Sequence, residues 1–459
     1  MYRTALAYLS DWTKRFSRKP LIIRGARQVG KSYLVRMLSD ANFDNLLEIN
    51  LETDTSAPEL FVSKDPDTIV NLLEARYGQV IVPGKTLLFL DEIQATPELF
   101  AGLRYFHEKM PELHVITAGS LLDFMLADHN FSMPVGRIEY LYLGPMTFEE
   151  FLLAAGRESL LDTLRDFSFP GDISRPIHDE LMRLTRQFTL VGGMPAAVEA
   201  FLDSGNFLES AAVQQSILTT YRDDFNKYTR KVDQHRIEKV FKKIPMLIGS
   251  KFIYSRVDKE DRSRELSRAF DLLCRAWVAH RVRHSSANGV PLDAEASDRV
   301  FKVLFMDVGL MCRALGLHLA DIEIVDDLML VNSGVVCEQL IGQHLLFGGE
   351  VFVEPSLHCW IRQKSQSNAE VDYVIALGDK IIPVEVKSGK TGRLKSLHVF
   401  LGRKKRHFAV RFNSDLPSLL NAETSIAGEE KRPFHLMSLP LYMVTQAKRL
   451  CREYLTKEQ

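Results

Sequence analysis

One stretch near the start of the chain has residue types and a spacing suited to holding phosphate groups. The segment Gly25-Ala26-Arg27-Gln28-Val29-Gly30-Lys31-Ser32-Tyr33 contains the pattern GxxxxGK[ST] and directly follows a short apolar run, Leu21–Arg24. Glycines let the backbone amides of such a loop wrap around phosphate oxygens, and the N-terminus of the following helix adds a partial positive charge. We expect these residues to bind a nucleotide, with Lys31 on the β- and γ-phosphates and Ser32 on Mg²⁺.

Two adjacent acids follow a second apolar run. Thr86–Leu90 reads as a buried strand, and Asp91 and Glu92 come at its carboxyl end. We expect Asp91 to hold Mg²⁺, mainly through water, and Glu92 to polarise the attacking water as a general base. The additional glutamate favours hydrolysis over nucleotide binding alone.

Two further residues are predicted to act at the same site. Thr117 ends the apolar run Leu113–Thr117, and either Thr117 or Ser120 is expected to orient the water or the γ-phosphate, although ordinary loop capping explains them equally well. Arg137 is a candidate arginine finger or sensor, acting either in its own chain or on a neighbouring subunit. The alternative for Arg137 is a solvated surface arginine.

A predicted hairpin near the C-terminus brings acids and a lysine together. Glu370–Ala376 and Ile381–Lys387 read as strands, and Gly378-Asp379 suits a two-residue turn. Pairing Leu377 with Lys380 then places Asp372 opposite Glu385, with Lys387 on the same face.

This arrangement resembles the PD-(D/E)xK nuclease site. The resemblance implies that Asp372 and Glu385 coordinate Mg²⁺, that Lys387 activates water, and that Glu338 supplies an additional acid. The alternative is a cross-strand salt bridge on a solvent-exposed sheet face, and Pro383 within the second strand counts against the nuclease scheme.

The stretch Lys387–Arg411 contains nine basic residues and no acidic one. Such a run predicts contacts with the phosphate backbone of DNA or RNA. A solvated helix face is the alternative, especially for Arg403–Arg406.

The composition excludes several classes of protein. The 459 residues are 46% hydrophobic with a formal net charge of −1, so the chain is neither disordered nor drawn to nucleic acid by its overall charge. Its five cysteines are scattered and do not have the spacing of metal ligands. The sequence contains no apolar stretch long enough to predict a membrane-spanning helix. We therefore expect a cytoplasmic protein.

The elements that position these residues predict an α/β fold. Apolar runs alternate with helical segments up to about residue 146, which indicates a parallel sheet. We predict a P-loop ATPase domain over residues 1–146, a helical middle domain over 147–330 and a second α/β domain over 331–459. Within these, we expect a helix over Ser263–His284 and a short strand over Val351–Glu354.

Several motifs resemble those of prokaryotic AAA-type ATPases. They are GARQVGKS, LLFLDEIQ, ITAGSLLDF, PVGRIEYLYLGPMTFEEF, LVGGMPAAV, YRDDFNKY and FKVLFMDVGL. The resemblance implies an AAA-like five-stranded sheet, a helical lid, a winged-helix-like middle region and a C-terminal restriction-endonuclease-like domain. It also implies ATP and Mg²⁺ as cofactors, and it is compatible with a homo-oligomer.

Three functional hypotheses follow. The first is an ATPase that drives or switches its C-terminal domains, with nucleic acid as one candidate target. The second is an ATP-regulated nuclease, and the third is an ATP switch whose inactive nuclease-like domain binds DNA or protein.

Overall fold

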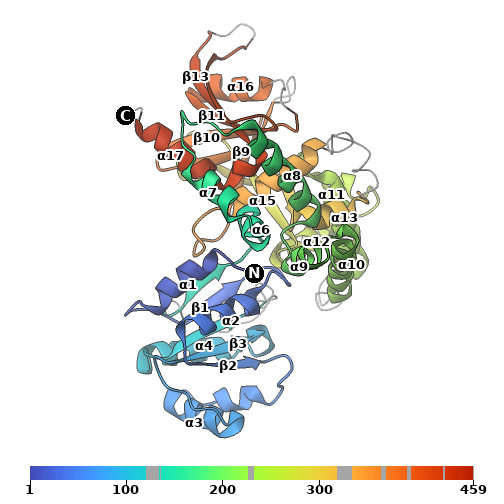
Figure 1. Ribbon diagram of the computed structural model, residues 1–459. Helices are drawn as coiled ribbons and strands as arrows, with labels where there is room; N and C mark the ends of the chain where they lie inside the picture. Colours follow the sequence, from blue (N-terminus) through green and yellow to red (C-terminus); the bar gives the residue numbers. More distant parts are fainter. Residues whose placement is uncertain are drawn as a thin grey trace. The chain divides into compact units, whose positions relative to one another are not determined.

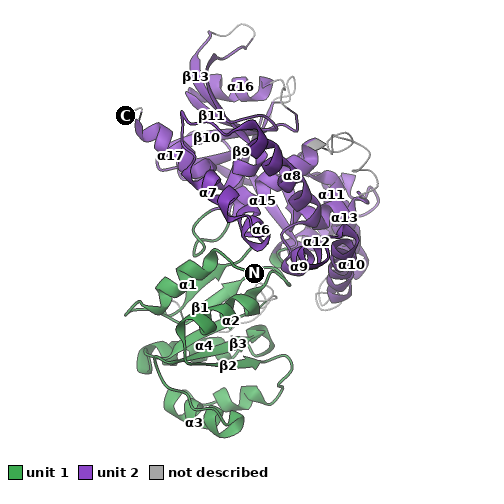
Figure 2. Ribbon diagram, viewed as in Figure 1, with its two compact units in different colours: residues 1–144, 275–277, 349–355 green, residues 145–274, 278–348, 356–459 purple. Residues whose placement is uncertain are grey.

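The chain forms two compact units (Figure 2). A computed structural model describes residues 1–119, 134, 136–225, 232–317, 333–362, 369–389, 394–426 and 430–457. Unit 1 comprises residues 1–144, 275–277 and 349–355, and unit 2 comprises 145–274, 278–348 and 356–459. The end of the first segment at Gly144 lies two residues from the boundary predicted after residue 146.

A five-stranded parallel sheet forms the centre of unit 1, in the order β2-β3-β4-β1-β5. Figure 1 labels three of these strands, β1, β2 and β3. The strands are β1 (Leu21–Arg24), β2 (Asn45–Asn50), β3 (Thr86–Asp91), β4 (His114–Ala118) and β5 (Glu139–Tyr142). Strands β3 and β4 are buried at every position, as expected for a parallel sheet covered on both faces. Because all pairs are parallel, the carboxyl ends of the strands meet at one edge. The predicted parallel α/β sheet is confirmed.

The helices of unit 1 are α1 (Ala5–Thr13), α2 (Lys31–Asn42), α3 (Pro66–Tyr77) and α4 (Leu99–Lys109). The ends of helix α3 are set by its capping residues. Asp65 caps its first turn by accepting from the Thr68 amide at 3.3 Å, Pro66 occupies the first helical position, and Gly78 ends the helix with φ +64°. Its Ile69 and Leu73 are buried in the core of unit 1.

A segment from much later in the sequence completes unit 1. Residues 349–355 lie beside β5, where the Tyr142 amide donates to the Val351 carbonyl at 2.7 Å and the Phe352 ring stacks on Tyr8. The predicted strand over Val351–Glu354 is wrong. The Val353 amide bonds back to the Glu350 carbonyl at 2.9 Å, which closes a turn.

An eight-stranded mixed sheet lies in unit 2, in the order β12-β13-β11-β10-β9-β8-β6-β7. Its strands are β6 (Ala279–Ser285), β7 (Ala296–Phe305), β8 (Leu357–Ile361), β9 (Glu370–Leu377), β10 (Lys380–Val386), β11 (Phe408–Asn413), β12 (Ser418–Glu423) and β13 (Pro433–Pro440). Strand β6 pairs in parallel with β8, so the β6–β7 hairpin belongs to the same sheet as the C-terminal strands. The predicted division at residue 330 therefore does not separate two sheets, and the winged-helix-like arrangement stays a prediction.

The described helices of unit 2 lie in the predicted middle region up to Ala314 and in the C-terminal region from Ser333 onward. They are α6 (Phe148–Ala154), α7 (Glu158–Asp166), α8 (Arg175–Val191), α9 (Pro195–Ser204), α10 (Phe207–Asp224), α11 (Gln234–Leu247), α12 (Ser263–Arg275), α13 (Val308–Ala314), α15 (Ser333–Phe347), α16 (Lys395–Lys404) and α17 (Ala447–Lys457). The predicted helix Ser263–His284 is wrong beyond Arg275, because pairing with β7 and β8 draws the following residues into β6. Among the described helices, none is long and apolar enough to cross a membrane.

Two glycine-containing motifs meet inside unit 2. Gly192 ends α8 with φ +74°, and an added Cβ on Gly309 would lie 2.5 Å from the Gly192 nitrogen. The buried Asp307 carboxylate accepts from the Gly193 amide at 2.7 Å and from the Leu310 amide at 3.0 Å. Glycine is required here because the two backbones touch.

Candidate functional site

The predicted phosphate loop runs from the carboxyl end of β1 to the first turn of α2. Gly25 and Gly30 have φ values of +144° and +90°, and Gln28 also adopts a positive φ of +62°. An added Cβ on Gly25 would overlap the carbonyl oxygen of Leu143, just beyond β5. The loop therefore packs directly on the end of β5, which only glycine permits.

A buried arginine that the sequence did not reveal holds this loop in place. Arg3 donates from Nη1 to the Val29 carbonyl at 2.6 Å and from Nη2 to the Gly144 carbonyl at 2.7 Å. It thereby ties the phosphate loop to the chain just after β5. No pattern could have indicated Arg3, since its partners are backbone carbonyls, which every residue has.

Lys31 lies inside the loop. Its Nζ donates to the carbonyls of Gly25 and Ala26 at 3.0 and 2.8 Å, and the side chain is buried. Burial lowers the pKa of Lys31 to about 8, although the nearby carboxylates of Glu92 and Asp91 act in the opposite direction. The backbone carbonyls of the loop thus hold the Lys31 ammonium at the start of the loop.

Ser32 and Asp91 lie side by side although 59 residues separate them. The Ser32 hydroxyl donates to Asp91 Oδ2 at 2.7 Å, and Asp91 Oδ1 accepts from the Glu92 amide at 3.0 Å. Burial raises the pKa of Asp91, which the hydrogen bond from Ser32 opposes. A hydroxyl and a carboxylate within hydrogen-bond reach are oxygen ligands of the kind that Mg²⁺ prefers, so these two residues fit the predicted ion.

Glu92 occupies a left-handed conformation with φ +52° directly after β3. Its carboxylate accepts a short hydrogen bond from the side-chain amide of Gln94. The Gln94 side chain also fills the space in front of Gly119, where an added Cβ would overlap it. Gln94, which the sequence did not single out, therefore orients the predicted general base between the ends of β3 and β4.

Thr117 lies in the middle of the sheet, between Leu90 of β3 and Ile22 of β1. Its side chain is completely buried, and its hydroxyl has no hydrogen-bond partner within the described part of the chain. Tyr33, by contrast, is 48% exposed on α2. The roles of both residues in nucleotide binding stay predictions.

Arg137 lies far from the phosphate loop of its own chain. It precedes β5, whose first residue, Glu139, pairs with Leu21 at the start of β1. The phosphate loop follows the other end of β1, about 13 Å away at about 3.3 Å per residue. Arg137 Nε instead donates to Glu108 Oε1 at 2.9 Å on α4. The structure does not bring Arg137 to its own phosphate loop, and a role at a neighbouring subunit stays a prediction.

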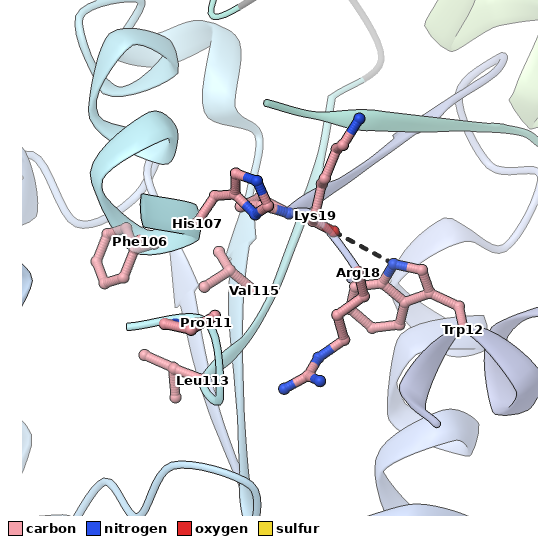
Figure 3. A pocket seen from close by; sticks show the side chains of 9 residues that line it. Trp12, Arg18, Lys19, Phe106, His107, Pro111, Leu113 and Val115 are labelled. Atoms are coloured by element: carbon pink, nitrogen blue, oxygen red, sulfur yellow. Dashed lines mark hydrogen bonds between the residues drawn. The ribbon is translucent and has the colours of Figure 1, made fainter. Parts of the chain in front are cut away.

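A pocket opens at this same amino edge of the sheet (Figure 3). Trp12, Phe106 and Leu113 line it, and the Trp12 indole donates to the Lys19 carbonyl at 3.2 Å. Because the phosphate loop lies at the opposite edge, this pocket is separate from the predicted nucleotide site.

The predicted hairpin near the C-terminus has the expected register. Lys380 pairs with Leu377 and Val384 with Tyr373, and just beyond these pairs the Val386 amide donates to Asp372 Oδ2 at 2.8 Å. Asp372 and Glu385 are only 8% and 5% exposed, so the alternative of a solvent-exposed sheet face is wrong. Helices α15 (Ser333–Phe347) and α16 (Lys395–Lys404) pack on β10, the strand that carries Glu385.

A lysine from β7 stands among the predicted acids. Lys302 Nζ lies 2.7 Å from Glu370 Oε1, 2.8 Å from Glu338 Oε2 and 3.3 Å from Asp372 Oδ1. Lys387 Nζ lies 2.7 Å from Glu385 Oε1. We call these six residues the carboxylate–lysine cluster.

The cluster contains four carboxylates and two ammonium groups in a largely buried place. Burial raises the pKa of Glu338, and burial together with the Asp372 carboxylate raises the pKa of Glu385. Burial acts to lower the pKa of Lys302, but the carboxylates of Glu338, Asp372 and Glu370 outweigh it and raise the pKa well above the ordinary value. Lys302 therefore carries a permanent positive charge.

The cluster does not fit the Mg²⁺ that the sequence predicted for Asp372 and Glu385. The Lys302 ammonium already occupies the point where the carboxylates of Glu338, Glu370 and Asp372 converge. Across the described ranges, no group of three or more acids, histidines or cysteines has a geometry that could hold a metal ion. The sequence did not identify Lys302 because its partners are distant in the chain.

The basic stretch Lys387–Arg411 is partly engaged in internal contacts. Lys404 donates to the Asn288 side chain at 2.7 Å, Arg406 to the Asn288 carbonyl at 2.8 Å, and Arg411 to Ser438 at 3.1 Å. Two of its members, Lys390 and Arg393, lie outside the described residues. A nucleic-acid interface on this stretch stays a prediction.

Comparison with known families assigns the N-terminal part of the chain. Residues 17–152 match the family model of an AAA domain. The N-terminal part of the chain is an AAA-type P-loop ATPase domain. Downstream of the AAA domain, residues 182–321 and 333–418 match two domains of unknown function, DUF8612 and DUF4143.

Solved structures show distant similarity to the chain that carries this AAA domain. A Walker-type ATPase of Pyrococcus abyssi is 14% identical, covering 68% of this chain and 94% of its own, with a TM-score of 0.44. A signal transduction ATPase with a tetratricopeptide repeat sensor from Pyrococcus horikoshii is 11% identical, covering 74% and 44%, with a TM-score of 0.27. The RuvB Holliday junction branch migration motor of Thermotoga maritima is 13% identical, covering 61% and 86%, with a TM-score of 0.25. No curated protein matches the sequence.

Proposed function

We propose that the AAA domain binds Mg·ATP and hydrolyses it. The observation that carries this proposal is the 2.7 Å hydrogen bond between Ser32 and Asp91, which joins the phosphate loop to the acidic end of β3. A hydroxyl and a carboxylate from two separate motifs thus meet beside the loop, as the binding of one magnesium ion requires.

Each residue of the site has a role in this scheme. The amides of the loop from Gly25 to Gly30 and the N-terminus of α2 bind phosphate oxygens, and Lys31 neutralises their charge. Ser32 and Asp91 hold Mg²⁺, which supplies Lewis-acid stabilisation of the phosphates when bound. Glu92, oriented by Gln94, accepts a proton from the attacking water.

ATP binding and hydrolysis serve in this proposal to switch the C-terminal part of the chain. The end of β5 touches the phosphate loop at Gly25 and continues through Gly144 directly into unit 2. Residues 349–355, which bond to β5, continue into β8 of unit 2. A nucleotide that orders the loop therefore acts on two segments that are covalently joined to unit 2.

The two alternatives for the C-terminal domain are not supported equally. Lys302 among the carboxylates counts against the ATP-regulated nuclease and favours an ATP switch whose nuclease-like domain binds DNA or a partner protein. A cytoplasmic location and homo-oligomer formation belong to this proposal as well.

Phosphate release and nucleotide binding by full-length protein test the proposal. We expect Lys31→Ala to lose both, and Glu92→Gln to keep ATP binding while hydrolysis falls by a factor of about 10² to 10⁴. Lys85→Ala, which removes an exposed lysine of the same unit, serves as the matched control and should retain full activity. Equal phosphate release by wild type, Lys31→Ala and Glu92→Gln would overturn the assignment.

A further inference from the structure

We propose that Lys302 is a built-in cation that takes the place of a divalent metal ion in the nuclease-like domain, so that this centre is metal-independent and does not cleave phosphodiesters. The proposal concerns unit 2 alone and does not depend on the ATPase activity of unit 1. It rests on the geometry of the carboxylate–lysine cluster.

The carboxylates of the cluster converge on one atom. Glu338 comes from α15, whereas Glu370 and Asp372 come from β9, and all three reach Lys302 Nζ within 3.3 Å. A divalent ion bound by the same oxygens would stand at the same point, at about 2.0–2.6 Å from them. The ammonium and the ion therefore exclude each other.

Lys302 cannot swing away from this point at low cost. Its backbone is paired in the sheet, where it stands opposite Val282 of β6, and its side chain is only 3% exposed. Its Nζ also lies 6.0 Å from the centre of the Tyr373 ring, whose hydroxyl donates to the Glu338 carbonyl at 2.7 Å. The same packing that holds the acids thus holds the lysine.

The charges of the cluster agree with this role. The first lysine, Lys302, pairs with three of the acids, and the second, Lys387, pairs with the fourth acid, Glu385. Glu385 Oε2 is buried without a hydrogen-bond partner among the described residues. The cluster therefore holds its acids with two monovalent cations and leaves one carboxylate oxygen unpaired.

The test is metal binding by full-length protein in an Asp91→Ala background, which removes the predicted magnesium ligand of unit 1. In this background, we expect no Mn²⁺ to bind by isothermal calorimetry and no change of the melting temperature with Mn²⁺. Replacing Lys302 by Ala should open the site, so that one Mn²⁺ binds per chain. At about 100 times the Kd, the melting temperature should rise by about 5 °C, and EDTA should reverse the rise.

Lys387→Ala is the matched control, because it removes the other lysine of the cluster without opening the point of convergence; it should bind no Mn²⁺. If Lys302→Ala does not fold, the same measurement is made with Lys302→Gln. Mn²⁺ binding by the parent, the Asp91→Ala protein, tests the proposal independently of either variant. The proposal is overturned if the parent binds Mn²⁺ and Asp372→Asn abolishes that binding. It is also overturned if folded Lys302→Ala and Lys302→Gln bind no Mn²⁺, or if wild type cleaves DNA or RNA with Mn²⁺ in a reaction that Lys387→Ala abolishes.

Discussion

Substituting Gly25 by Ala tests whether the phosphate loop depends on its contact with β5. The added Cβ would lie 2.1 Å from the Leu143 carbonyl oxygen, and the backbone fixes the positions of both atoms, so that no side-chain rotation relieves the overlap. Overpacking of this kind costs about 1–3 kcal/mol. The φ of +144° adds backbone strain of about 1–3 kcal/mol for any residue with a side chain. We therefore expect unit 1 to lose about 2–6 kcal/mol of unfolding free energy.

Gly78→Ala provides the matched control in the same unit. Gly78 also has a positive φ, +64°, but no atom lies within 4 Å of an added Cβ. Only the conformational cost of about 1–2 kcal/mol applies there. Because the two glycines differ in φ, a loss in Gly25→Ala beyond the backbone strain of about 1–3 kcal/mol indicates the steric contact with Leu143.

Tryptophan fluorescence can follow the unfolding of unit 1. Of the three tryptophans, Trp12 and Trp277 lie in unit 1 and Trp360 in unit 2, so a Trp360→Phe background reports on unit 1 alone. At about 2–4 °C per kcal/mol, Gly25→Ala should melt about 5–20 °C below the parent. ATP affinity should fall in parallel, because the loop must move. Equal melting temperatures for Gly25→Ala and Gly78→Ala would refute the reasoning.

Three further predictions concern the same domain. Arg3→Met should lower the unfolding free energy of unit 1 by about 3–6 kcal/mol in denaturant titrations, because each of its two hydrogen bonds from a charged group contributes about 1.5–3 kcal/mol, whereas the exposed Arg15→Met should have little effect. Phosphates favour charged Lys31, whose pKa is lowered to about 8, so ATP affinity should weaken about tenfold at pH 9 relative to pH 7. In Lys31→Arg, whose guanidinium stays charged over this range, the affinity should not change with pH, and a constant affinity in wild type would contradict the prediction. Arg137→Ala should leave ATP affinity unchanged, because Arg137 pairs with Glu108 in an exposed ion pair, which contributes about 0–1 kcal/mol to stability. A tenfold loss of ATP affinity would show that Arg137 reaches the phosphate loop of its own chain.

The sequence alone determined those parts of the protein in which neighbouring residues act together. The phosphate loop follows a strand and precedes a helix within one continuous segment, so its pattern predicts its geometry directly. The register of β9 and β10 followed from the turn at Gly378, because a two-residue turn leaves only one pairing for the strands beside it. In both cases, the local geometry depends on residues that are close together in the sequence, and distant parts of the fold do not change it.

Only the tertiary structure decided the chemistry of the carboxylate–lysine cluster and the surroundings of the loop. Lys302 lies 36 residues from Glu338 and 70 from Asp372, and Arg3 lies 141 residues from Gly144. Burial of a charge, and the choice of its partner, arise when distant strands enter one sheet, as β6 and β7 do in unit 2. The sequence showed which residues could form a metal site, but the packing of the sheet decided that a lysine stands where the metal would bind.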